Sequence, residues 1–417
     1  MNNPLQSKHI ILGVTGSIAC YKAADLASKM TQAGAQVDVL LTAGATQFIT
    51  PLTFQSVTGR RAFTDADLWG HEAHVIHVGL GHSTDLVVVA PITANTMAKL
   101  AHGIADNLLT VTALAANCPL LIAPAMDGGM FSHPATQANL ETLRQRGAYV
   151  VGPAEGHLAS GLAGIGRMVE PVEILGQVRR LLAQGGPLAG RKVVVTAGGT
   201  QEAIDPVRSI TNRSSGKQGF SLAQAALDLG AEVTLIAGNT SLPTPYGARR
   251  VDVRSAQEML TAVLTEIEEA DALLMAAAVA DFRPAAPAGQ KIKKEAGPPE
   301  IRLENTPDIL TAVAGRKAES RHPRITVGFA AESQNLLENA RGKVKRKKLD
   351  LMVANDITAR DAGFAVDTNR VTLIDASGAT EQLPLMSKDE VAAVVLEKVL
   401  ALLGIAAQPE ESGHGGV

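Results

Sequence analysis

Several features that define large classes of proteins are scarce or missing in this 417-residue chain. Its two cysteines, Cys20 and Cys118, exclude a disulfide framework and are typical of a reducing compartment. The net charge of −3 gives no basis for binding nucleic acid or a membrane surface through overall charge. No apolar run is long enough to span a membrane, and no secretion signal is visible at the N-terminus. We expect a soluble, cytoplasmic protein that binds neither nucleic acid nor membranes.

Aromatic residues are also scarce, at 3% of the chain, whereas apolar residues make up 46%. The cores are therefore expected to be aliphatic and rich in alanine. The length suffices for two domains, each with its own core. Because apolar strand-like runs alternate with helical segments in both halves, we predict an α/β fold with two Rossmann-like open-sheet domains.

The domain boundary is predicted at residues 184–190, where glycine and proline cluster. We interpret this segment as a linker between an N-terminal domain at 1–183 and a C-terminal domain at 191–404, in which the strand pattern begins again. Residues 405–417 are polar and rich in glycine, so we expect a disordered tail there.

In the first half, strands are expected at 9–14, 37–41, 85–90, 120–123 and 149–151. The first strand ends in the turn Thr15-Gly16-Ser17, and a helix follows, which gives a βαβ unit with a turn of the size that holds a phosphate. The sequence GVTGSIA lacks GxGxxG, and no acidic residue ends the second strand, so a mononucleotide or flavin phosphate fits better than a dinucleotide. The glycine-rich segment 156–168 is predicted to be a mobile loop that acts as a lid or clamp.

The second half opens with the stretch 192–220, KVVVTAGGTQEAIDPVRSITNRSSGKQGF. A β-branched strand runs into Gly198-Gly199, and a polar cluster at 212–216 leads into a helix. This arrangement presents backbone N–H groups to a phosphate in open α/β sheets. A glycine-rich connection without a ligand is the alternative, but the density of polar residues favours a binding site. Further strands are expected at 233–237, 272–276, 325–329 and 351–354, followed by a hairpin-like pair at 370–375 and 382–384 and a last helix at 388–403.

Two basic segments interrupt this pattern. Residues 284–300 are rich in proline, glycine and alanine and carry Lys291, Lys293 and Lys294, so we predict a mobile basic flap over a phosphate rather than an exposed linker. Lys343 and Lys347 lie four residues apart in a predicted helix and can point the same way. This spacing favours phosphate binding over a merely solvated helix face.

Long motifs in a fixed order then point to a family. In the first half they are GSIACYK at 16–22, HVGL at 77–80, APITANTMAKLAHGIADNLL at 90–109 and PAMDGGM at 124–130. In the second half they are TAGGTQEAIDPVRSITNRSSGKQG, AAAVADFRP, KIKK, NTPDIL and GFAAES. From residue 9 to about residue 403 the chain resembles the bifunctional phosphopantothenoylcysteine decarboxylase / phosphopantothenate–cysteine ligase family of coenzyme A biosynthesis. The resemblance implies a flavodoxin-like flavoprotein domain followed by a nucleotide-binding ligase domain.

For the second half, the resemblance implies ligation of cysteine to 4′-phosphopantothenate with CTP as co-substrate and Mg²⁺. The acid attacks the α-phosphate to give an acyl-cytidylate and pyrophosphate, and the cysteine amine then displaces CMP. Asn212 matches the family's asparagine at the acyl-cytidylate, and Asp281 matches a nucleotide-binding aspartate that is also the candidate metal ligand. The residues that match the family's CTP site are Ala277, Ala278, Val279, Asp281, Lys291, Pro307, Asp308, Ile309, Leu310, Phe329, Lys343 and Lys347.

The first half is similar to FMN-dependent cysteine decarboxylases, whose flavin oxidises the thiol carbon so that the carboxylate is lost, and then returns the electrons to the enethiol. The product here would be 4′-phosphopantetheine. His77 matches the catalytic base, a role that suits a group titrating near neutrality. The alternative is a metal site of His71, His74, His77 and His82, which we disfavour because the segment has no clear helix, no cysteine and one carboxylate. FMN is expected at Gly16, Ser17, Ile18, Thr42, Ala94, Asn95 and Thr96.

Two candidate catalytic positions depart from the family's pattern. Asp127 replaces an asparagine that contacts the substrate carboxylate, and an ionised Asp127 would repel that group unless its pKa is raised or a cation intervenes. Ser160 replaces the cysteine proton donor, and a hydroxyl is a much weaker acid than a thiol of pKa about 8.5. Cys118 lies at the wrong end of the sheet; Cys20 lies in a first helical turn, where a thiol pKa can fall, although a small core residue is the simpler interpretation. The alternative function is an active ligase fused to a weak or inactive FMN-binding scaffold.

Two further interpretations of the first half remain. A flavin prenyltransferase shares the FMN-binding fold, but the His77 motif and the fused ligase disfavour it. An NAD-linked dehydrogenase is disfavoured by the missing dinucleotide pattern. The family finally implies a homo-oligomer with a trimer-based flavin domain and a dimeric ligase domain.

Overall fold

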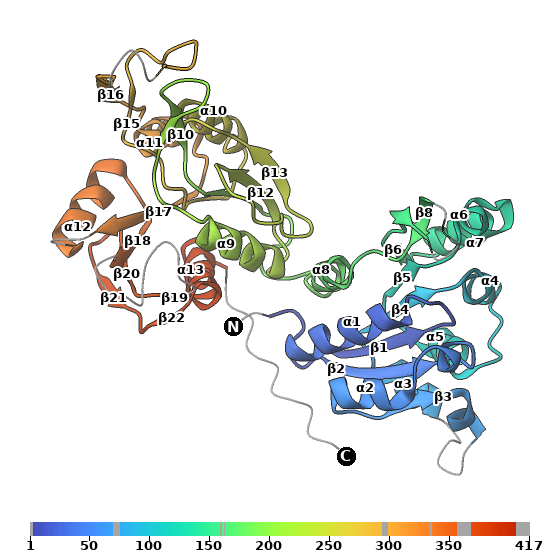
Figure 1. The fold of residues 1–417 in the computed structure, drawn as a ribbon. Coiled ribbons are helices and arrows are strands. Elements are labelled where there is room, and N and C mark those ends of the chain that lie inside the picture. Colours follow the sequence, from blue (N-terminus) through green and yellow to red (C-terminus); the bar gives the residue numbers. More distant parts are fainter. Residues whose placement is uncertain are drawn as a thin grey trace. The chain divides into compact units, whose positions relative to one another are not determined.

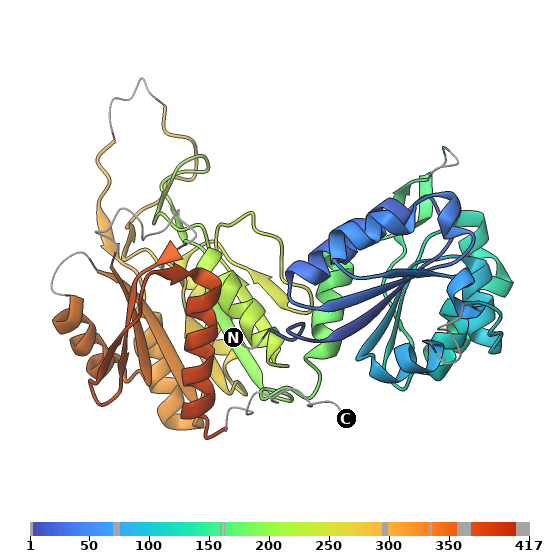
Figure 2. The same ribbon diagram turned by 90° about the horizontal axis from the view of Figure 1, so that it is seen from below.

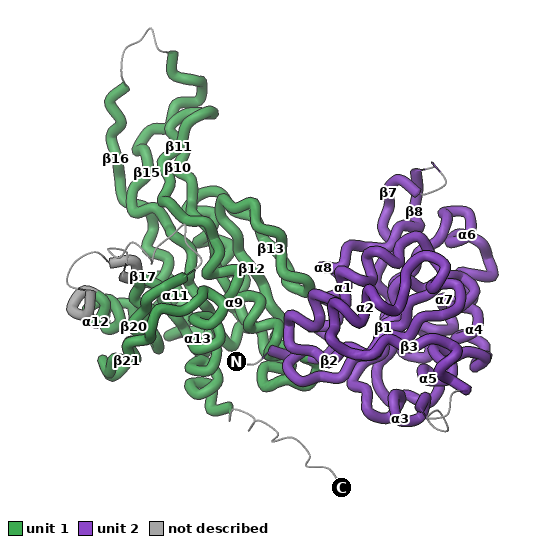
Figure 3. The backbone as a smooth tube through the Cα atoms, turned by 60° about the horizontal axis from the view of Figure 1, so that its bottom comes forward, with its two compact units in different colours: residues 1–2, 183–417 green, residues 3–182 purple. Residues whose placement is uncertain are grey.

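The computed structural model describes residues 3–69, 76–158, 161, 163–293, 299–332, 336–356 and 368–405. The chain divides between Leu182 and Ala183 into two compact units: residues 3–182, purple in Figure 3, are the first unit in the text, and the residues from Ala183 on, green in Figure 3, are the second unit. Each unit has its own hydrophobic core. Among the described residues, no helix combines the length and the apolar character needed to cross a membrane.

The first unit is built on a parallel sheet of six strands in the order β3-β2-β1-β4-β5-β6 (Figure 1). The strands are β1 (His9–Val14), β2 (Gln36–Leu41), β3 (Ala62–Thr64), β4 (Leu86–Ile92), β5 (Leu120–Pro124) and β6 (Tyr149–Val150). Five of them were predicted, and without the short edge strand β3 their order reduces to the flavodoxin order 2-1-3-4-5. The predicted open-sheet fold is therefore confirmed.

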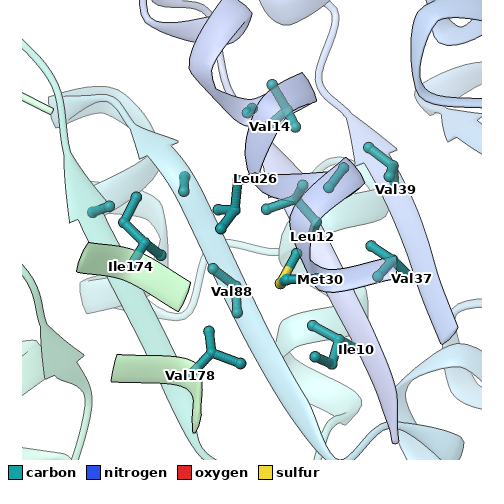
Figure 4. Packing of buried hydrophobic residues seen from close by; sticks show 14 of the residues in the cluster. Ile10, Leu12, Val14, Leu26, Met30, Val37, Val39, Val88, Ile174 and Val178 are labelled. Atoms are coloured by element: carbon teal, nitrogen blue, oxygen red, sulfur yellow. The ribbon is translucent and has the colours of Figure 1, made fainter. Parts of the chain in front are cut away.

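Helices cover both faces of this sheet, which is why its strands read as continuous apolar runs. The helices are α1 (Cys20–Gln32), α2 (Pro51–Thr58), α3 (Ile76–Ser83), α4 (Ala94–His102), α5 (Leu108–Ala115), α6 (Gly128–Ser132), α7 (Pro134–Gln145) and α8 (Pro171–Leu182). Leu26 and Met30 of α1 and Ile174 and Val178 of α8 pack on one face, against alternate residues of β1, β2 and β4 (Figure 4). Residues of α4, α5 and α7 pack on the other face.

The sequence interpretation was wrong about two segments of this unit. The described residues of the segment 156–168, predicted to be a mobile loop, contribute to an antiparallel hairpin of β7 (Ala154–His157) and β8 (Ala163–Arg167), in which Gly156 and Gly164 face each other. Its exposed, glycine-rich strands lack the apolar alternation that marks a strand. The histidine segment contains α3, whose pattern was missed because the helix is short and carries two glycines, one packed against α5.

The second unit contains an eight-stranded sheet in the order β13-β12-β9-β14-β17-β18-β20-β21. Its strands are β9 (Lys192–Ala197), β12 (Glu232–Ala237), β13 (Arg249–Asp252), β14 (Ala272–Met275), β17 (Ile325–Glu332), β18 (Leu351–Asp356), β20 (Val371–Asp375) and β21 (Thr380–Gln382). The first six in this spatial order are parallel and follow the Rossmann order 3-2-1-4-5-6, and the predicted hairpin β20–β21 adds an antiparallel edge.

The helices of the second unit also cover both faces of its sheet. They are α9 (Lys217–Asp228), α10 (Ala256–Glu266), α11 (Ile309–Ser320), α12 (Leu336–Lys347) and α13 (Lys388–Leu402). Helices α9 and α13 lie side by side on one face (Figure 2), and α10 and α11 pack on the other. Three small two-stranded sheets join β10 (Gln201–Ala203) to β11 (Ser209–Thr211), β15 (Phe282–Pro284) to β16 (Leu303–Asn305), and β19 (Thr368–Asn369) to β22 (Met386–Ser387).

The segment 184–190, predicted to be a linker, packs into the second unit. Leu188 is fully buried in its core, and the Leu188 N–H donates to the carbonyl of Leu229 at 2.8 Å. The predicted tail beyond Ile405 lies outside the described residues, as do Lys294 and Ser160.

Candidate functional site

The carboxyl ends of β9 and β14 lie side by side in the second unit, at the point where the strand order reverses. The loops after the two strands are joined through their backbones: Ala278 N–H donates to Gly198 O at 2.8 Å, and Thr200 N–H donates to Ala278 O at 3.3 Å. Two fully buried threonine hydroxyls accept from the same loop, Thr196 from Ala277 N–H at 3.1 Å and Thr200 from Ala280 N–H at 2.9 Å. The predicted nucleotide segment 277–279 is therefore held rigidly at the place where such sheets bind ligands.

Asn212 follows β11 and reaches this loop. Its Nδ2 donates to the carbonyl of Val279 at 2.9 Å, so two residues predicted to belong to one site are in contact. Gly199 passes close beneath, since a Cβ at that position would lie 2.9 Å from the carbonyl oxygen of Asn212. Only glycine allows this approach of the two chain segments.

Asp308 and Lys347 also come together, although 38 residues separate them in the sequence. Lys347 Nζ at the end of α12 lies 3.1 Å from Asp308 Oδ1, which also accepts from Thr311 N–H at 3.2 Å and so caps α11. Partial burial raises the pKa of Asp308, but the hydrogen bonds from Thr311 and Lys347 outweigh it, and the pKa is lowered overall. The carboxylate is charged, and Lys347 stands beside the predicted nucleotide turn.

The other predicted CTP residues differ in how far they are exposed. Asp281, Lys291 and Asp308 are exposed, whereas Pro307 and Lys343 are half-buried. Ile309 is 4% exposed and belongs to the core, and Leu310 packs beside it, so these two side chains serve packing. Phe329 on β17 is half-buried against the core beneath α9 and α13.

The predicted metal ligand Asp281 is not part of a dense ligand set. Among the described residues, no group of three or more His, Cys, Asp or Glu side chains is arranged to hold a metal ion. A magnesium ion at Asp281 would therefore take its other ligands from phosphate and water, which is the usual arrangement for Mg²⁺ with nucleotides.

The first unit presents a similar edge where β1 and β4 are neighbours. The Thr15 hydroxyl donates to Pro91 O at 2.8 Å and accepts from Thr93 N–H at 3.0 Å, which ties the two loops together. Gly16 lies against a second loop, because a Cβ there would be 2.9 Å from the carbonyl carbon of Gly44. Helix α1 begins after this turn, and its cap residue Ala19 makes no side-chain hydrogen bond to the helix. The N–H groups of Ala19 and Cys20 donate to Ser17, to its Oγ at 3.3 Å and to its carbonyl at 3.0 Å. The start of the helix is therefore only partly open to a phosphate.

The other predicted FMN residues differ in what they offer a ligand. Ile18 is 60% exposed, whereas Thr42 and Thr96 are buried, and their hydroxyls are engaged within the protein. Ser17 lies in the turn before α1, and Ala94 and Asn95 begin α4, next to its cap Thr93. The loop backbones and the few exposed side chains are thus the groups that remain for a flavin.

His77 is the second residue of α3 and is half-buried. Its Nδ1 is buried and has no hydrogen-bond partner in the described part of the chain. Such an atom is the kind of group that a bound molecule satisfies. His82 is exposed and five residues away, so it lies on a different side of the helix. His71 and His74 of the alternative metal site lie outside the described residues.

Asp127 caps the short helix α6, and its Oδ1 accepts from Gly129 N–H at 2.9 Å. It borders an open pocket of about 560 Å³ between α6 and the β7–β8 hairpin, whose lining includes Leu158, Gly164 and Ile165. The hairpin is fastened to this loop, because Met126 N–H donates to Gly166 O at 3.0 Å. The described strands β7 and β8 therefore lie beside the Asp127 loop.

Neither cysteine is activated. Cys20 is 1% exposed and its thiol donates to Thr15 O at 3.3 Å, and burial raises its pKa. Burial likewise raises the pKa of Cys118, which precedes β5 at the amino end of the sheet. The possibility of a lowered pKa at Cys20 is therefore wrong, and it is a core residue.

Comparison with known proteins agrees with the motifs. The family model for flavoproteins matches residues 1–183, and the model for the DNA/pantothenate metabolism flavoprotein C-terminal domain matches residues 188–403. The coenzyme A biosynthesis bifunctional protein CoaBC of Bacillus subtilis is 45% identical over 401 residues, which cover 95% of this chain and 98% of that protein. The chain belongs to the CoaBC family.

Other members span the chain equally well. The CoaBC protein of Mycobacterium tuberculosis is 45% identical over 408 residues, covering 95% of this chain and 97% of its own. A solved C-terminal domain of a CoaBC protein is 38% identical and covers 52% of this chain and 98% of its own, with a TM-score of 0.45. The full-length CoaBC relatives confirm the predicted bifunctional enzyme of coenzyme A biosynthesis, and the match of both halves to the family models argues against a flavin prenyltransferase or an NAD-linked dehydrogenase.

Sequence reasoning missed the interactions that hold the two candidate sites in shape. These are chiefly made by the buried threonines Thr15, Thr196 and Thr200, the half-buried Thr93, and the ion pair between Asp308 and Lys347. A signal was present for three of the threonines, because Thr15, Thr196 and Thr200 flank glycine turns at strand ends. No local signal pairs Asp308 with Lys347.

Proposed function

We propose that the second unit ligates cysteine to 4′-phosphopantothenate with CTP and Mg²⁺. The observation that carries this proposal is the contact between Asn212 and the 277–280 loop at the switch point of the sheet, with Lys347 nearby on α12. Amide formation through a nucleotidylate needs cations around a triphosphate and a neutral donor near the acyl group. Both kinds of group are present at this edge.

The proposed reaction has two steps. The carboxylate of 4′-phosphopantothenate attacks the α-phosphorus of CTP, and pyrophosphate leaves; the amine of cysteine then attacks the acyl carbon, and CMP leaves. Lys291, Lys343 and Lys347 neutralise the phosphates. Asn212, held through Val279, directs its amide toward the acyl-cytidylate, and Asp281 would hold Mg²⁺, which adds charge neutralisation when bound.

We further propose that the first unit decarboxylates the product to 4′-phosphopantetheine with FMN. The Gly16 turn, the start of α1 and the 94–96 turn fit a flavin phosphate. Bound FMN supplies the oxidation of the thiol carbon and the return of the electrons. His77 acts as the base, since its buried Nδ1 lacks a protein partner among the described residues.

The second candidate function is an active ligase fused to a weak or inactive FMN-binding scaffold. Asp127 favours it, because this carboxylate borders the pocket into which the substrate's own carboxylate would enter. Like charges at that position oppose binding. Ser160 favours it as well, since a serine is a poor donor for the last proton.

One experiment separates the outcomes. The purified protein is incubated with 4′-phosphopantothenate, cysteine, Mg²⁺ and CTP, and the products are identified by mass. Formation of 4′-phosphopantetheine means that both units act, and a stop at 4′-phosphopantothenoylcysteine means that only the ligase acts. Absence of pyrophosphate release would refute the ligase proposal. We also propose a cytoplasmic homo-oligomer, trimer-based at the flavin unit and dimeric at the ligase unit, which native mass spectrometry tests.

A further inference from the structure

Asp205 is a buried carboxylate that the reaction described above does not use. It lies in the turn between β10 and β11. Its side chain is fully buried, although it is close to the largely exposed segment 288–293. A buried charge is retained only where hydrogen bonds or an opposite charge compensate for its lost hydration. The groups that donate hydrogen bonds to Asp205 therefore show which part of the chain it positions.

Three backbone N–H groups donate to this carboxylate. Oδ1 accepts from Val207 and from Arg208, both at 2.8 Å, within the turn itself. Oδ2 accepts from Ile292 N–H at 3.1 Å, from a segment 87 residues further along the chain. Burial raises the pKa of Asp205, but these hydrogen bonds outweigh it and the pKa is lowered, so the group is a carboxylate at neutral pH.

The peptide groups around Lys291 are held from both sides. The Arg208 guanidinium donates to Ile292 O at 2.7 Å and lies 3.7 Å from Asp205 Oδ2. The N–H of Ile292 is therefore bound by Asp205, and its C=O is bound by Arg208. Three residues before Lys291, the Ala288 N–H donates to Ile204 O at 2.9 Å. Lys291 itself is exposed, and it lies between these two anchors.

The same hairpin also leads to Asn212. Strand β11 ends at Thr211, and Asn212 follows with its side chain on the carbonyl of Val279. In Figure 3 the β10–β11 hairpin lies beside the β15–β16 arm. One hairpin thus connects the amide proposed to face the acyl group with the backbone that carries a phosphate-binding lysine.

We propose that Asp205 is a positioning residue for the ligase reaction, which holds Lys291 in place for the nucleotide triphosphate through the backbone of Ile292. The inference rests on the proposed ligase function. It assigns Asp205 no contact with substrate. Replacing Asp205 is therefore expected to raise the KM for CTP, and to do so only through Lys291.

The substitution Asp205→Asn tests this with little change of shape. The amide oxygen still accepts from the turn, but the amide NH₂ then faces the Ile292 N–H, and two donors repel each other. We expect a rise of about tenfold in the KM for CTP, the scale of one lost hydrogen bond to a charged group, with the KM for cysteine within about twofold. Amide hydrogen exchange at 288–293 should accelerate. The control Asp252→Asn makes the same chemical change at a side chain that is 72% exposed. It should alter neither the KM for CTP nor amide hydrogen exchange at 288–293.

A double-mutant cycle separates positioning from a general structural role. If Asp205 acts through Lys291, then Asp205→Asn adds no further loss to Lys291→Ala. Fully additive losses, or an unchanged KM for CTP in Asp205→Asn, would overturn the inference while leaving the ligase proposal intact. If the wild type releases no pyrophosphate from CTP, the ligase proposal fails and this inference fails with it.

Discussion

Replacing Gly166 by alanine should disable the first unit while sparing the second. A Cβ at Gly166 would lie 2.2 Å from the carbonyl oxygen of Met126, far inside any real contact, and both partners are backbone that cannot rotate away. The hairpin and the Asp127 loop must therefore separate, and the hydrogen bond from Met126 N–H to Gly166 O is lost with them. Overpacking costs about 1–3 kcal/mol and loss of the hydrogen bond about 0.5–1.5 kcal/mol, so the free energy of unfolding of the first unit should fall by about 1.5–4.5 kcal/mol.

The functional loss should be larger than the loss of stability suggests. A displacement of about 1 Å at a substrate pocket commonly costs about a hundredfold in rate. We therefore expect carbon dioxide release to fall by about that factor, measured from 4′-phosphopantothenoylcysteine. Pyrophosphate release by the ligase should be unchanged, because the second unit has its own core.

Gly164→Ala is the matched control. It lies on the same strand, and a Cβ there meets nothing within 4 Å, so the thermal unfolding of the first unit and the ligase activity should stay as in the wild type. Because Gly164 also lines the pocket beside Asp127, carbon dioxide release is not part of this control. Equal thermal unfolding in the two variants would refute the reasoning. The unfolding measurement decides the matter even if the wild-type decarboxylase is slow.

Three further predictions concern separate parts of the chain. The hydrogen bond to Asp38 raises the pKa of His9 above 6.5. Below that pH, His9→Gln should therefore lower the free energy of unfolding by about 1.5–3 kcal/mol, and this difference should vanish as the pH rises through the raised pKa of His9. A difference that stays constant with pH would contradict this. Lys347→Gln should raise the KM for CTP about tenfold, whereas Lys398→Gln, at an exposed ion pair, should not, and equal KM values would count against a nucleotide contact. Gly16→Ala should abolish the yellow colour and flavin absorbance of the purified protein, because the added Cβ displaces the turn against the neighbouring loop; retained flavin would exclude this turn as the phosphate site.

Much of the fold could be predicted from local pattern. Strands such as β1, β9 and β18 are apolar runs bounded by turns, and burial on both faces makes such runs unmistakable. The β7–β8 hairpin could not be predicted in this way. Its strands are exposed and glycine-rich, and their pairing depends on contacts with the Asp127 loop rather than on their own residues.

The sequence alone determined the family, the two α/β units and the residue types at both candidate sites, because motifs and periodicity are written in consecutive positions. The tertiary structure decided which of those residues meet. It brought Asn212 to Val279 and Lys347 to Asp308, and it directed Ile309 into the core. It also revealed that the buried Asp205 carboxylate accepts a hydrogen bond from the backbone next to Lys291. Contacts of this kind join positions tens of residues apart, and only the path of the folded chain sets them.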